Sequence, residues 1–552
     1  MRLFTLITWL AISARIYAIG PEDVVVVANE NDPDSLAIAE YYMAKRDIPP
    51  KNLIKLSTTK AEAISGEQFF AEIFNPLRVE LIEREWINGV LARDNDGAGR
   101  RKVVSMGHKI GYLVLCRLPY QIKGHSTEAL EAFPNNLTGA MANSQSSVDS
   151  ELSLLPLIDT PLAGPVNNPL FQQKKPSYMA LNSIVRIARL DGPSVAAVKR
   201  LIDSALAGEA QGLKGRAYLD KGGPHKQGEE WLDQCGKLIE QLNYPLSIDT
   251  EKPQFSWKDR MDAPALYFGW WTHVPNGPFD DPLFRLPSGS VAIHISSFSG
   301  DALRQPSMRW SGGFVERGVA ATVGNVYEPY LQLTHQPHLF LEALVDGMST
   351  GEAAYYSLQG LSWMTIFLGD PLYQPFKVSL DEQLTNVKAD NSLDQYVILR
   401  EAERIGKESG KDAAFEYQRR GFNRAPGLAL AYAIAQGWEE RNERTKAVKQ
   451  LEFVAQMGTF TPEDFGLAYQ IAEMLIGMNE RETGYQIIRT LANEARSDEA
   501  KMTFMQSGIP LANQFREREY AVKWETEIAA IKRKRAELAE RRKAAREAAK
   551  KK

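Results

Sequence analysis

The chain has 552 residues, of which 44% are hydrophobic and 24% charged, and its net charge at pH 7 is −4. This composition is ordinary for a soluble globular protein, and the length predicts two to four domains. The cysteine count, two, excludes a disulfide-rich scaffold and a Cys-rich metal site.

The first residues read as an export signal. Arg2 precedes a mostly apolar run over residues 3–12, and Ala18 is a suitable cleavage point. The run is too short to span a bilayer, and no later stretch reaches ~18 uncharged apolar residues. We therefore predict a signal peptide over residues 1–18, a periplasmic or extracellular location, and no transmembrane segment in the mature chain. An ordinary buried first strand or helix is the alternative.

Residues 19–378 alternate between strand-length apolar runs and helical patterns. Asp32 and Pro33 are typical of a helix start, and the capping-box pattern occurs at residues 65–68 and 349–352. Because the strands lack period-2 polarity, we predict a mainly parallel sheet with helices on both faces. The apolar runs are residues 24–28, 110–115, 185–190, 215–220, 265–268, 290–295 and 318–323.

A long polar segment interrupts this pattern. Residues 122–175 are rich in Pro, Asn and Ser, which predicts an insertion or a lid. The two cysteines lie within apolar patterns: Cys116 ends a strand-like run and Cys235 shares a helical face with leucines. Both are expected to be small buried hydrophobes, and whether they pair is open.

The last third of the chain contains a repeat. Residues 430–435 (LAYAIA) recur at 467–472 (LAYQIA) and residues 442–444 (NER) recur at 479–481, each offset by 37. Repeats of this length, each a pair of amphipathic helices, indicate a helical solenoid, which we place at residues 390–530 after a linker at 379–389. It resembles tetratricopeptide repeats, and an unrelated helical bundle is the alternative. Its surface is a candidate for binding a partner protein.

The C-terminal tail is basic. The last 21 residues hold 11 Lys or Arg against 3 Glu, which leaves the rest of the chain at −12. Residues 531–552 favour helix but have little to bury, so we expect a solvated helical extension or a disordered tail. No aromatic residues interleave with these charges, and no nucleic-acid ligand is expected.

Three strands in succession end in small, polar or aromatic residues. In a parallel α/β sheet, ligands bind beyond the carboxyl ends of the strands, so these endings predict the floor of a site. The flat apolar surfaces of tryptophan and tyrosine suit a peptide or glycan ligand. The predicted ligand-binding residues are Gly269, Trp270, Trp271, Ser296, Ser297, Ser299, Asn325, Tyr327 and Glu328.

Known catalytic motifs are absent from the sequence. There is no Walker loop, dinucleotide fingerprint or His-Glu-x-x-His, and no cofactor or metal is predicted. His335 and His338 are three apart but Pro337 intervenes and no third ligand is near. If catalysis exists, the candidates are His294, Ser297, Asp301, Glu328 and Asp370. His294 is the obvious base for Ser297, although residues three apart on a strand point to opposite faces.

Several strings within residues 22–378 are specific enough to compare with known proteins. They are residues 35–42 (SLAIAEYY), 147–152 (SVDSEL), 189–193 (RLDGP), 269–270 (GW), 294–298 (HISSF), 324–331 (GNVYEPYL) and 369–376 (GDPLYQPF). Together they resemble an uncharacterised family of exported bacterial proteins associated with genomes that carry exosortase. The resemblance implies context rather than an activity.

The order of elements over residues 265–323 is also similar to the core of caspase-like cysteine peptidases, including gingipains. In those enzymes one strand ends in His-Gly and the next ends near a Cys. Here the matching endings are Gly269-Trp270 and Ser296-Ser297. Indole only donates, and serine without a base is a weak nucleophile, so the resemblance implies that the peptidase dyad is missing.

The sequence therefore favours an exported, non-catalytic accessory protein of an envelope or protein-export process. It would bind a peptide or glycan in the α/β pocket and a protein partner on the helical repeats. The alternative is a hydrolase, peptidase- or esterase-like, with a non-standard Ser/His/acid site.

Overall fold

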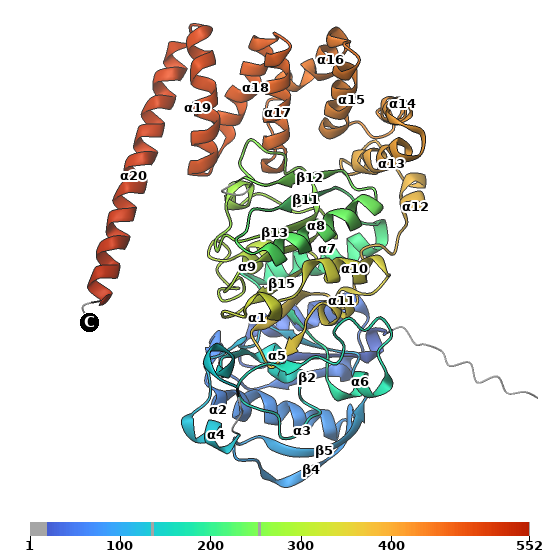
Figure 1. The fold of residues 1–552 in the computed structure, drawn as a ribbon, viewed down its shortest axis with the longest axis vertical. Coiled ribbons are helices and arrows are strands. Elements are labelled where there is room, and N and C mark those ends of the chain that lie inside the picture. The colour runs from blue at the N-terminus through green and yellow to red at the C-terminus, as the bar shows by residue number, and fades with distance from the viewer. Residues whose placement is uncertain (1–18, 134–136, 252–254, 551–552) are drawn as a thin grey trace, which may run out of the picture.

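The structure is a computed structural model that describes residues 19–133, 137–251 and 255–550. Figure 1 shows an α/β domain, a row of helices along one end of it, and a long C-terminal helix that extends beside the domain. The predicted signal peptide lies outside the described residues, and export stays a prediction. Within the described part of the chain, no helix is long and apolar enough to cross a membrane.

The α/β domain is built on a ten-stranded sheet in which most neighbouring strands pair in parallel. β15 and β17, however, are antiparallel. This architecture confirms the predicted fold class of an α/β domain followed by helices. In spatial order the strands are β12 (Leu246–Asp249), β11 (Arg216–Asp220), β13 (Pro264–Trp270), β14 (Val291–Ile295), β15 (Ala321–Asn325), β17 (Thr365–Gly369), β10 (Ile187–Leu190), β6 (Tyr112–Cys116), β1 (Val24–Asn29) and β2 (Leu53–Leu56).

Both faces of the sheet are covered, which explains why its strands are apolar without alternation. In β1, Val24 and Val26 belong to one hydrophobic cluster, whereas Val25 and Val27 belong to another. The first cluster includes residues of α1 (Pro33–Arg46), α7 (Val195–Gln211), α8 (Lys226–Gln241), α9 (Trp310–Glu316), α10 (Pro337–Val345) and α11 (Thr350–Tyr356). The second includes residues of α3 (Asn75–Glu83) and α5 (Val148–Leu152).

The helix starts follow the local sequence. Asp32 accepts a hydrogen bond from the Asp34 main-chain N–H at the start of α1. Ser65 and Ser349 both form complete capping boxes, as predicted from their sequence pattern. Within the predicted lid at residues 122–175, α5 is buried and packs on β10 and β17. That part of the segment therefore belongs to the core.

The C-terminal part consists of helices that pack in consecutive antiparallel pairs. The second and third pairs start 37 residues apart, at Leu428 and Phe465, as the repeat in the sequence indicates. The basic C-terminal segment continues the last helix. The pairs are α13 (Asp394–Ser409) with α14 (Lys411–Gly421), α15 (Leu428–Glu440) with α16 (Arg444–Leu451), α17 (Phe465–Gly477) with α18 (Arg481–Glu494), and α19 (Asp498–Gln514) with α20 (Arg518–Lys550).

The two parts share a buried interface. Trp257, from a loop of the α/β domain, is fully buried within the hydrophobic cluster of the helical repeats. Beside it, buried Asp262 forms a two-bond ion pair with Arg260 at 2.8 Å and accepts a 2.8 Å hydrogen bond from the Tyr396 hydroxyl of α13. The edge strand β12 lies directly beneath the row of helices (Figure 1).

Candidate functional site

The carboxyl ends of β13, β14 and β15 lie side by side because the three strands are parallel and adjacent. Beyond them is a pocket of about 190 Å³. Six of the predicted ligand-binding residues line it, namely Trp270, Trp271, Ser296, Ser297, Asn325 and Glu328. Six other lining residues were not predicted: His225 precedes α8, Ile295 ends β14, and Pro329, Tyr330, Leu331 and Thr334 come from the segment after β15.

The two adjacent tryptophans have different roles. Trp270 is buried, and its indole N–H donates to Glu229 Oε1 at 2.6 Å. Gly223 and Gly228 lie against its ring, and a Cβ at either position would clash with it. Trp271 is 44% exposed at the pocket. Trp271 is therefore the aromatic surface that a ligand can reach, and Trp270 supports the wall behind it.

Asn325 and Ser299 hold the pocket floor together. The Asn325 main-chain N–H donates to Ser299 Oγ at 3.1 Å, and its side-chain amide donates to the Ser296 carbonyl at 3.1 Å. The Asn325 amide oxygen accepts from Thr334 Oγ1 at 3.1 Å. These bonds fix the loop after β14 to the end of β15, which gives Asn325 a positioning role at the pocket that it lines.

Gly269 and Tyr327 do not line the pocket. A Cβ on Gly269 would lie 2.7 Å from the Tyr267 hydroxyl, which itself donates to Asp220 at 2.8 Å, so glycine makes room for that bond. Tyr327 is half-buried, and its carbonyl accepts from the Phe298 N–H at 3.1 Å. Both residues therefore shape the strand endings from outside the pocket.

His294, the predicted candidate base, lies in the core. Its ring stacks on Trp310 with centroids 3.8 Å apart, and Nδ1 lies 3.2 Å from the Tyr267 hydroxyl. Burial lowers the pKa of His294 to about 3, so it is neutral at physiological pH. Strand β14 ends at Ile295, before Ser297, and no hydrogen bond joins His294 to Ser297 in the described residues.

The three acidic candidates do not converge. Asp301 pairs with Arg309 at 2.8 Å, and exposed Glu328 accepts from the Tyr330 main-chain N–H at 3.2 Å. Asp370, a catalytic candidate from the sequence, does not lie near the pocket. It follows β17, which is antiparallel to β15, so it lies at the opposite end from the pocket, where it accepts from Tyr42.

A histidine that the sequence did not single out lies against the site. His273 Nδ1 is 3.0 Å from Ser296 Oγ, the hydroxyl at the carboxyl end of β14. His273 is exposed, three residues beyond Trp270 in the loop after β13. Trp310 holds this loop, because its indole N–H donates to the Thr272 carbonyl at 2.8 Å. The sequence analysis considered only His294 as the base, and the turn of the loop after β13 is what brings His273 to Ser296.

The Ser296 hydroxyl has two possible acceptors. Besides His273 Nδ1, the Ser297 carbonyl lies 3.1 Å from Ser296 Oγ. The hydroxyl has one proton to donate. It donates to His273 when Nδ1 carries no hydrogen, and to the Ser297 carbonyl when Nδ1 carries one. The first arrangement places His273 as a base for Ser296.

The Asp301 carboxylate interacts electrostatically with His273. Burial raises the pKa of Asp301, while its bonds with Arg309 and the charge of His273 oppose the rise. No carboxylate hydrogen-bonds to His273 in the described part of the chain. The arrangement is a serine–histidine pair with a nearby carboxylate rather than a hydrogen-bonded triad.

The remaining candidates for chemistry are buried. His335 is enclosed, and His338 stacks on Trp231 with ring centroids 5.7 Å apart. No cluster of three metal-binding side chains occurs among residues 19–133, 137–251 and 255–550. Cys116 and Cys235 are both free and buried, and burial raises the pKa of each thiol.

Comparison with known proteins adds little. No protein-family model matches the chain, and no curated protein matches it. A solved structure described as "Structure of Protease" aligns with 65% of this chain and 80% of its own, at 12% identity and a TM-score of 0.32. A likeness this weak carries no argument about fold or activity.

Proposed function

We propose that the chain is a hydrolase in which Ser296 is the nucleophile and His273 the general base. The observation that supports this proposal is the 3.0 Å contact between Ser296 Oγ and His273 Nδ1 beside the pocket. A nucleophile and a base within 2.6–3.2 Å at the end of adjacent strands satisfy the geometry for covalent catalysis. This assignment corrects the pairing of His294 with Ser297 considered from the sequence.

The reaction that fits these groups is acyl transfer to water. As Ser296 Oγ bonds to the substrate carbonyl carbon, its proton moves to His273 Nδ1. The protonated His273 then donates that proton to the departing amine or alcohol, which leaves an acyl-serine ester. Water attacks this ester while His273 takes its proton, and His273 then returns that proton to Ser296 Oγ as the C–O bond breaks, which releases the acid and regenerates both side chains.

The surroundings suit this chemistry. Trp271, Ile295 and Leu331 give the adjacent pocket apolar walls, and its volume of about 190 Å³ suits one side chain or acyl group. Asn325 holds the Ser296 carbonyl and so limits movement of the nucleophile's main chain.

A serine-directed phosphonate probe tests the proposal. The wild-type protein should be labelled on one residue, Ser296, identified by peptide mass. Ser296→Ala should abolish labelling, and His273→Asn should slow it by about 100-fold or more, since general-base catalysis contributes 10²–10⁴-fold. The matched control is Ser297→Ala, which removes the neighbouring hydroxyl and should leave Ser296 as the labelled residue. Labelling that survives in Ser296→Ala, or none in the wild type, contradicts the proposal.

A second function, binding without catalysis, is favoured by the exposed ring of Trp271 at the pocket. In this proposal the chain is an exported accessory protein of an envelope or protein-export process, in the exosortase-associated context that the sequence strings suggest. The pocket would hold a peptide or glycan and the helical repeats a protein partner. Absence of phosphonate labelling together with ligand binding that Trp271→Ala abolishes would favour this function.

A further inference from the structure

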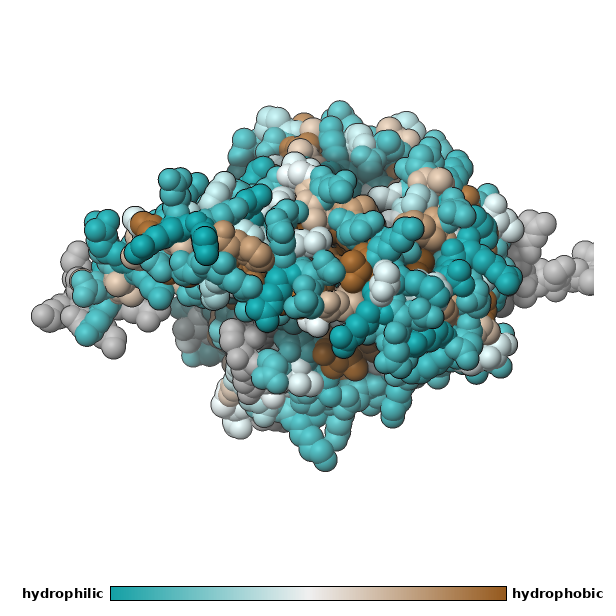
Figure 2. Space-filling view, turned by 90° about the horizontal axis from the view of Figure 1, so that it is seen from above, coloured by the Kyte–Doolittle hydropathy of each residue, from teal (hydrophilic) through white to brown (hydrophobic). Residues whose placement is uncertain are grey.

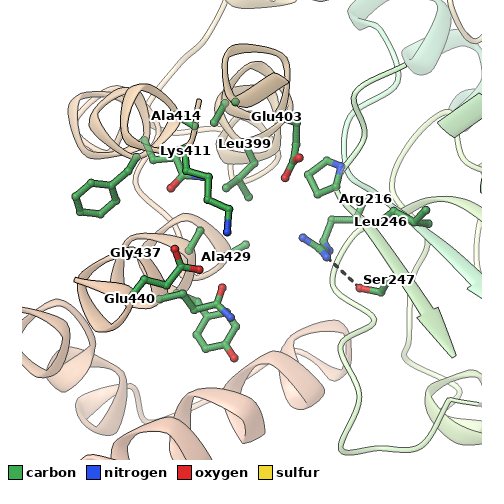
Figure 3. A pocket seen from close by; sticks show the side chains of 18 of the residues that line it. Arg216, Leu246, Ser247, Leu399, Glu403, Lys411, Ala414, Ala429, Gly437 and Glu440 are labelled. Carbon is green, nitrogen blue, oxygen red and sulfur yellow. Dashed lines mark hydrogen bonds between the residues drawn. The ribbon is translucent and has the colours of Figure 1, made fainter. Parts of the chain in front are cut away.

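A second, larger cavity lies between the two parts of the chain. Its volume is about 590 Å³, and its walls come from the β11–β12 edge of the sheet and from helices α13, α14, α15 and α17. Figure 3 shows the strand side of this cavity facing the helices across open space. From the helical end, the surface is mainly hydrophilic, with patches of hydrophobic residues exposed among the hydrophilic ones (Figure 2).

One wall of the cavity is an open sheet edge. β12 is the outermost strand and pairs only with β11. The carbonyls of Pro245 and Asp249 accept hydrogen bonds from the β11 side, so the alternating groups of Leu246 and Ile248 point outward. An edge strand with free N–H and C=O groups is a template for an added strand. Leu246 lines the cavity and Ile248 does not, so the Leu246 end of this template faces the cavity.

Arg216 carries a buried charge at the same wall. It is 8% exposed and lines the cavity, and Nη2 donates to Ser247 Oγ at 3.0 Å. Its Nε has no hydrogen-bond partner among the described residues, and no carboxylate lies within ion-pair distance of it there. The charge of Arg216 acts on the buried Asp262 carboxylate, but the two side chains form no ion pair. A buried guanidinium without a bonded carboxylate is costly, which makes this position favourable for an anion supplied by a ligand.

Other charged side chains besides Arg216 line the cavity. Arg260 and Arg441 are already paired, with Asp262 and Asp412. Lys411, across the cavity on α14, has no carboxylate within ion-pair distance in the described part of the chain and points toward the open space (Figure 3). Exposed Glu403 and Glu440 also line the cavity, but water screens exposed charges more than buried ones. The buried part of the site therefore favours a negative group.

The helical wall has room for a chain. Small residues on α15, Ala429, Ala433 and Gly437, lie along the cavity beside the ring of Tyr432. The amide side chains of Gln436 and Gln470 also line it, and they can bond to main-chain groups in either direction. Small side chains, amides and an open strand edge together suit an extended main chain.

We propose that this cavity binds an extended peptide segment of a partner protein, which adds to β12 as an edge strand and places a carboxylate side chain on Arg216. The main-chain bonds to Leu246 and Ile248 give affinity without sequence preference, and Arg216 gives the preference for an acidic residue. This site is independent of the Ser296–His273 pair, so neither proposal depends on the other.

The test uses the full chain and an array of nine-residue peptides with random flanks and a central Glu, beside the same peptides with a central Gln. Fluorescence anisotropy then measures the best Glu peptide, its Gln counterpart, and a version N-methylated at alternate residues. We expect the Gln and N-methylated peptides to bind at least tenfold more weakly to the wild-type protein. These comparisons need no variant and do not depend on folding of a mutant.

Two variants locate the contacts. Arg216→Gln should weaken the Glu peptide about tenfold while the Gln peptide is unaffected. Leu246→Pro removes one outward N–H without breaking the bonds to β11, and it should bind more weakly than the matched control Leu246→Ala, which loses the same side chain and keeps the N–H. Ser296→Ala should bind the peptide like the wild type.

Failure of every peptide to bind would overturn the proposal. Equal affinity for the Glu and Gln peptides would also overturn it, because Arg216 would then have no role. An N-methylated peptide that binds as tightly as the unmodified one would exclude strand addition.

Discussion

Replacing Trp257 with alanine should destabilise both parts of the protein together. Trp257 belongs to the α/β domain but is 0% exposed within the helical repeats, with ring centroids 5.9 Å from Phe465 and 6.4 Å from Phe504. Deleting the ring leaves a cavity at the interface. The helical region would then be held to the sheet by polar contacts such as the bond between Tyr396 and Asp262.

The expected loss of stability in Trp257→Ala can be estimated from the area that the Trp257 ring buries. A buried tryptophan removes about 200 Å² from water, worth about 5 kcal/mol at ~25 cal/mol per Å². The indole N–H of Trp257 has no partner among the described residues, which offsets about 1–3 kcal/mol of that gain. We therefore expect Trp257→Ala to lower the free energy of unfolding by about 3 kcal/mol. Trp257→Phe keeps a ring and removes the unpaired N–H, and it should cost about 1 kcal/mol or less.

Urea unfolding followed by far-UV circular dichroism measures these costs without relying on tryptophan fluorescence. The control is Trp271→Ala, since that ring is 44% exposed and its loss should change stability by about 0.5 kcal/mol at most. A cost below 1 kcal/mol for Trp257→Ala, or one equal to that of Trp271→Ala, would refute the shared interface.

Three further predictions concern buried polar groups. Burial lowers the pKa values of His294 and His335 to about 3. In the unfolded chain both histidines take up a proton near pH 6.5. The free energy of unfolding should therefore fall as the pH drops below 6.5, by up to ~1.4 kcal/mol per pH unit for each histidine. His294→Phe should make this slope shallower between pH 6 and 4, and an unchanged slope in urea titrations would contradict it. Tyr396→Phe removes a hydrogen bond to the Asp262 carboxylate and should cost about 1.5–3 kcal/mol in urea unfolding; no loss would mean that the bond does not form. Arg189→Met leaves the buried Asp149 carboxylate without its 2.5 Å ion pair, whereas Asp191 keeps its pair with Arg304 at 3.1 Å, and a cost of about 3–5 kcal/mol is expected; a thermal scan that matches the wild type would argue against it.

Much of the architecture is local and was predictable. Runs such as residues 24–28 and 290–295 become buried strands because consecutive apolar side chains require cover on both faces of a sheet. Ser65 and Ser349 cap helices because their neighbours three residues on complete the capping box. The offset of 37 residues became two equivalent helix pairs, since the spacing of apolar residues within each repeat is preserved.

The site was predictable only in part. Parallel order of β13, β14 and β15 brings Trp271 and Ser296 to one pocket, as expected from strand endings alone. Asn325 lies there as well, but its amide is used to fix the loop after β14. A residue type indicates which bonds are available, and the neighbours decide which are made.

The sequence determined the helices and strands, the repeat, and the strand ends where a site could form, because these depend on residues close together in the chain. Tertiary structure decided the rest. His273 meets Ser296 because a loop turns back over the strand end, and Asp370 lies far from both because β17 runs against β15. The cavity at Arg216 exists because helices from the last third of the chain pack beside β12. Contacts between distant residues depend on the path of loops and the direction of strands, and neither is set by composition or spacing.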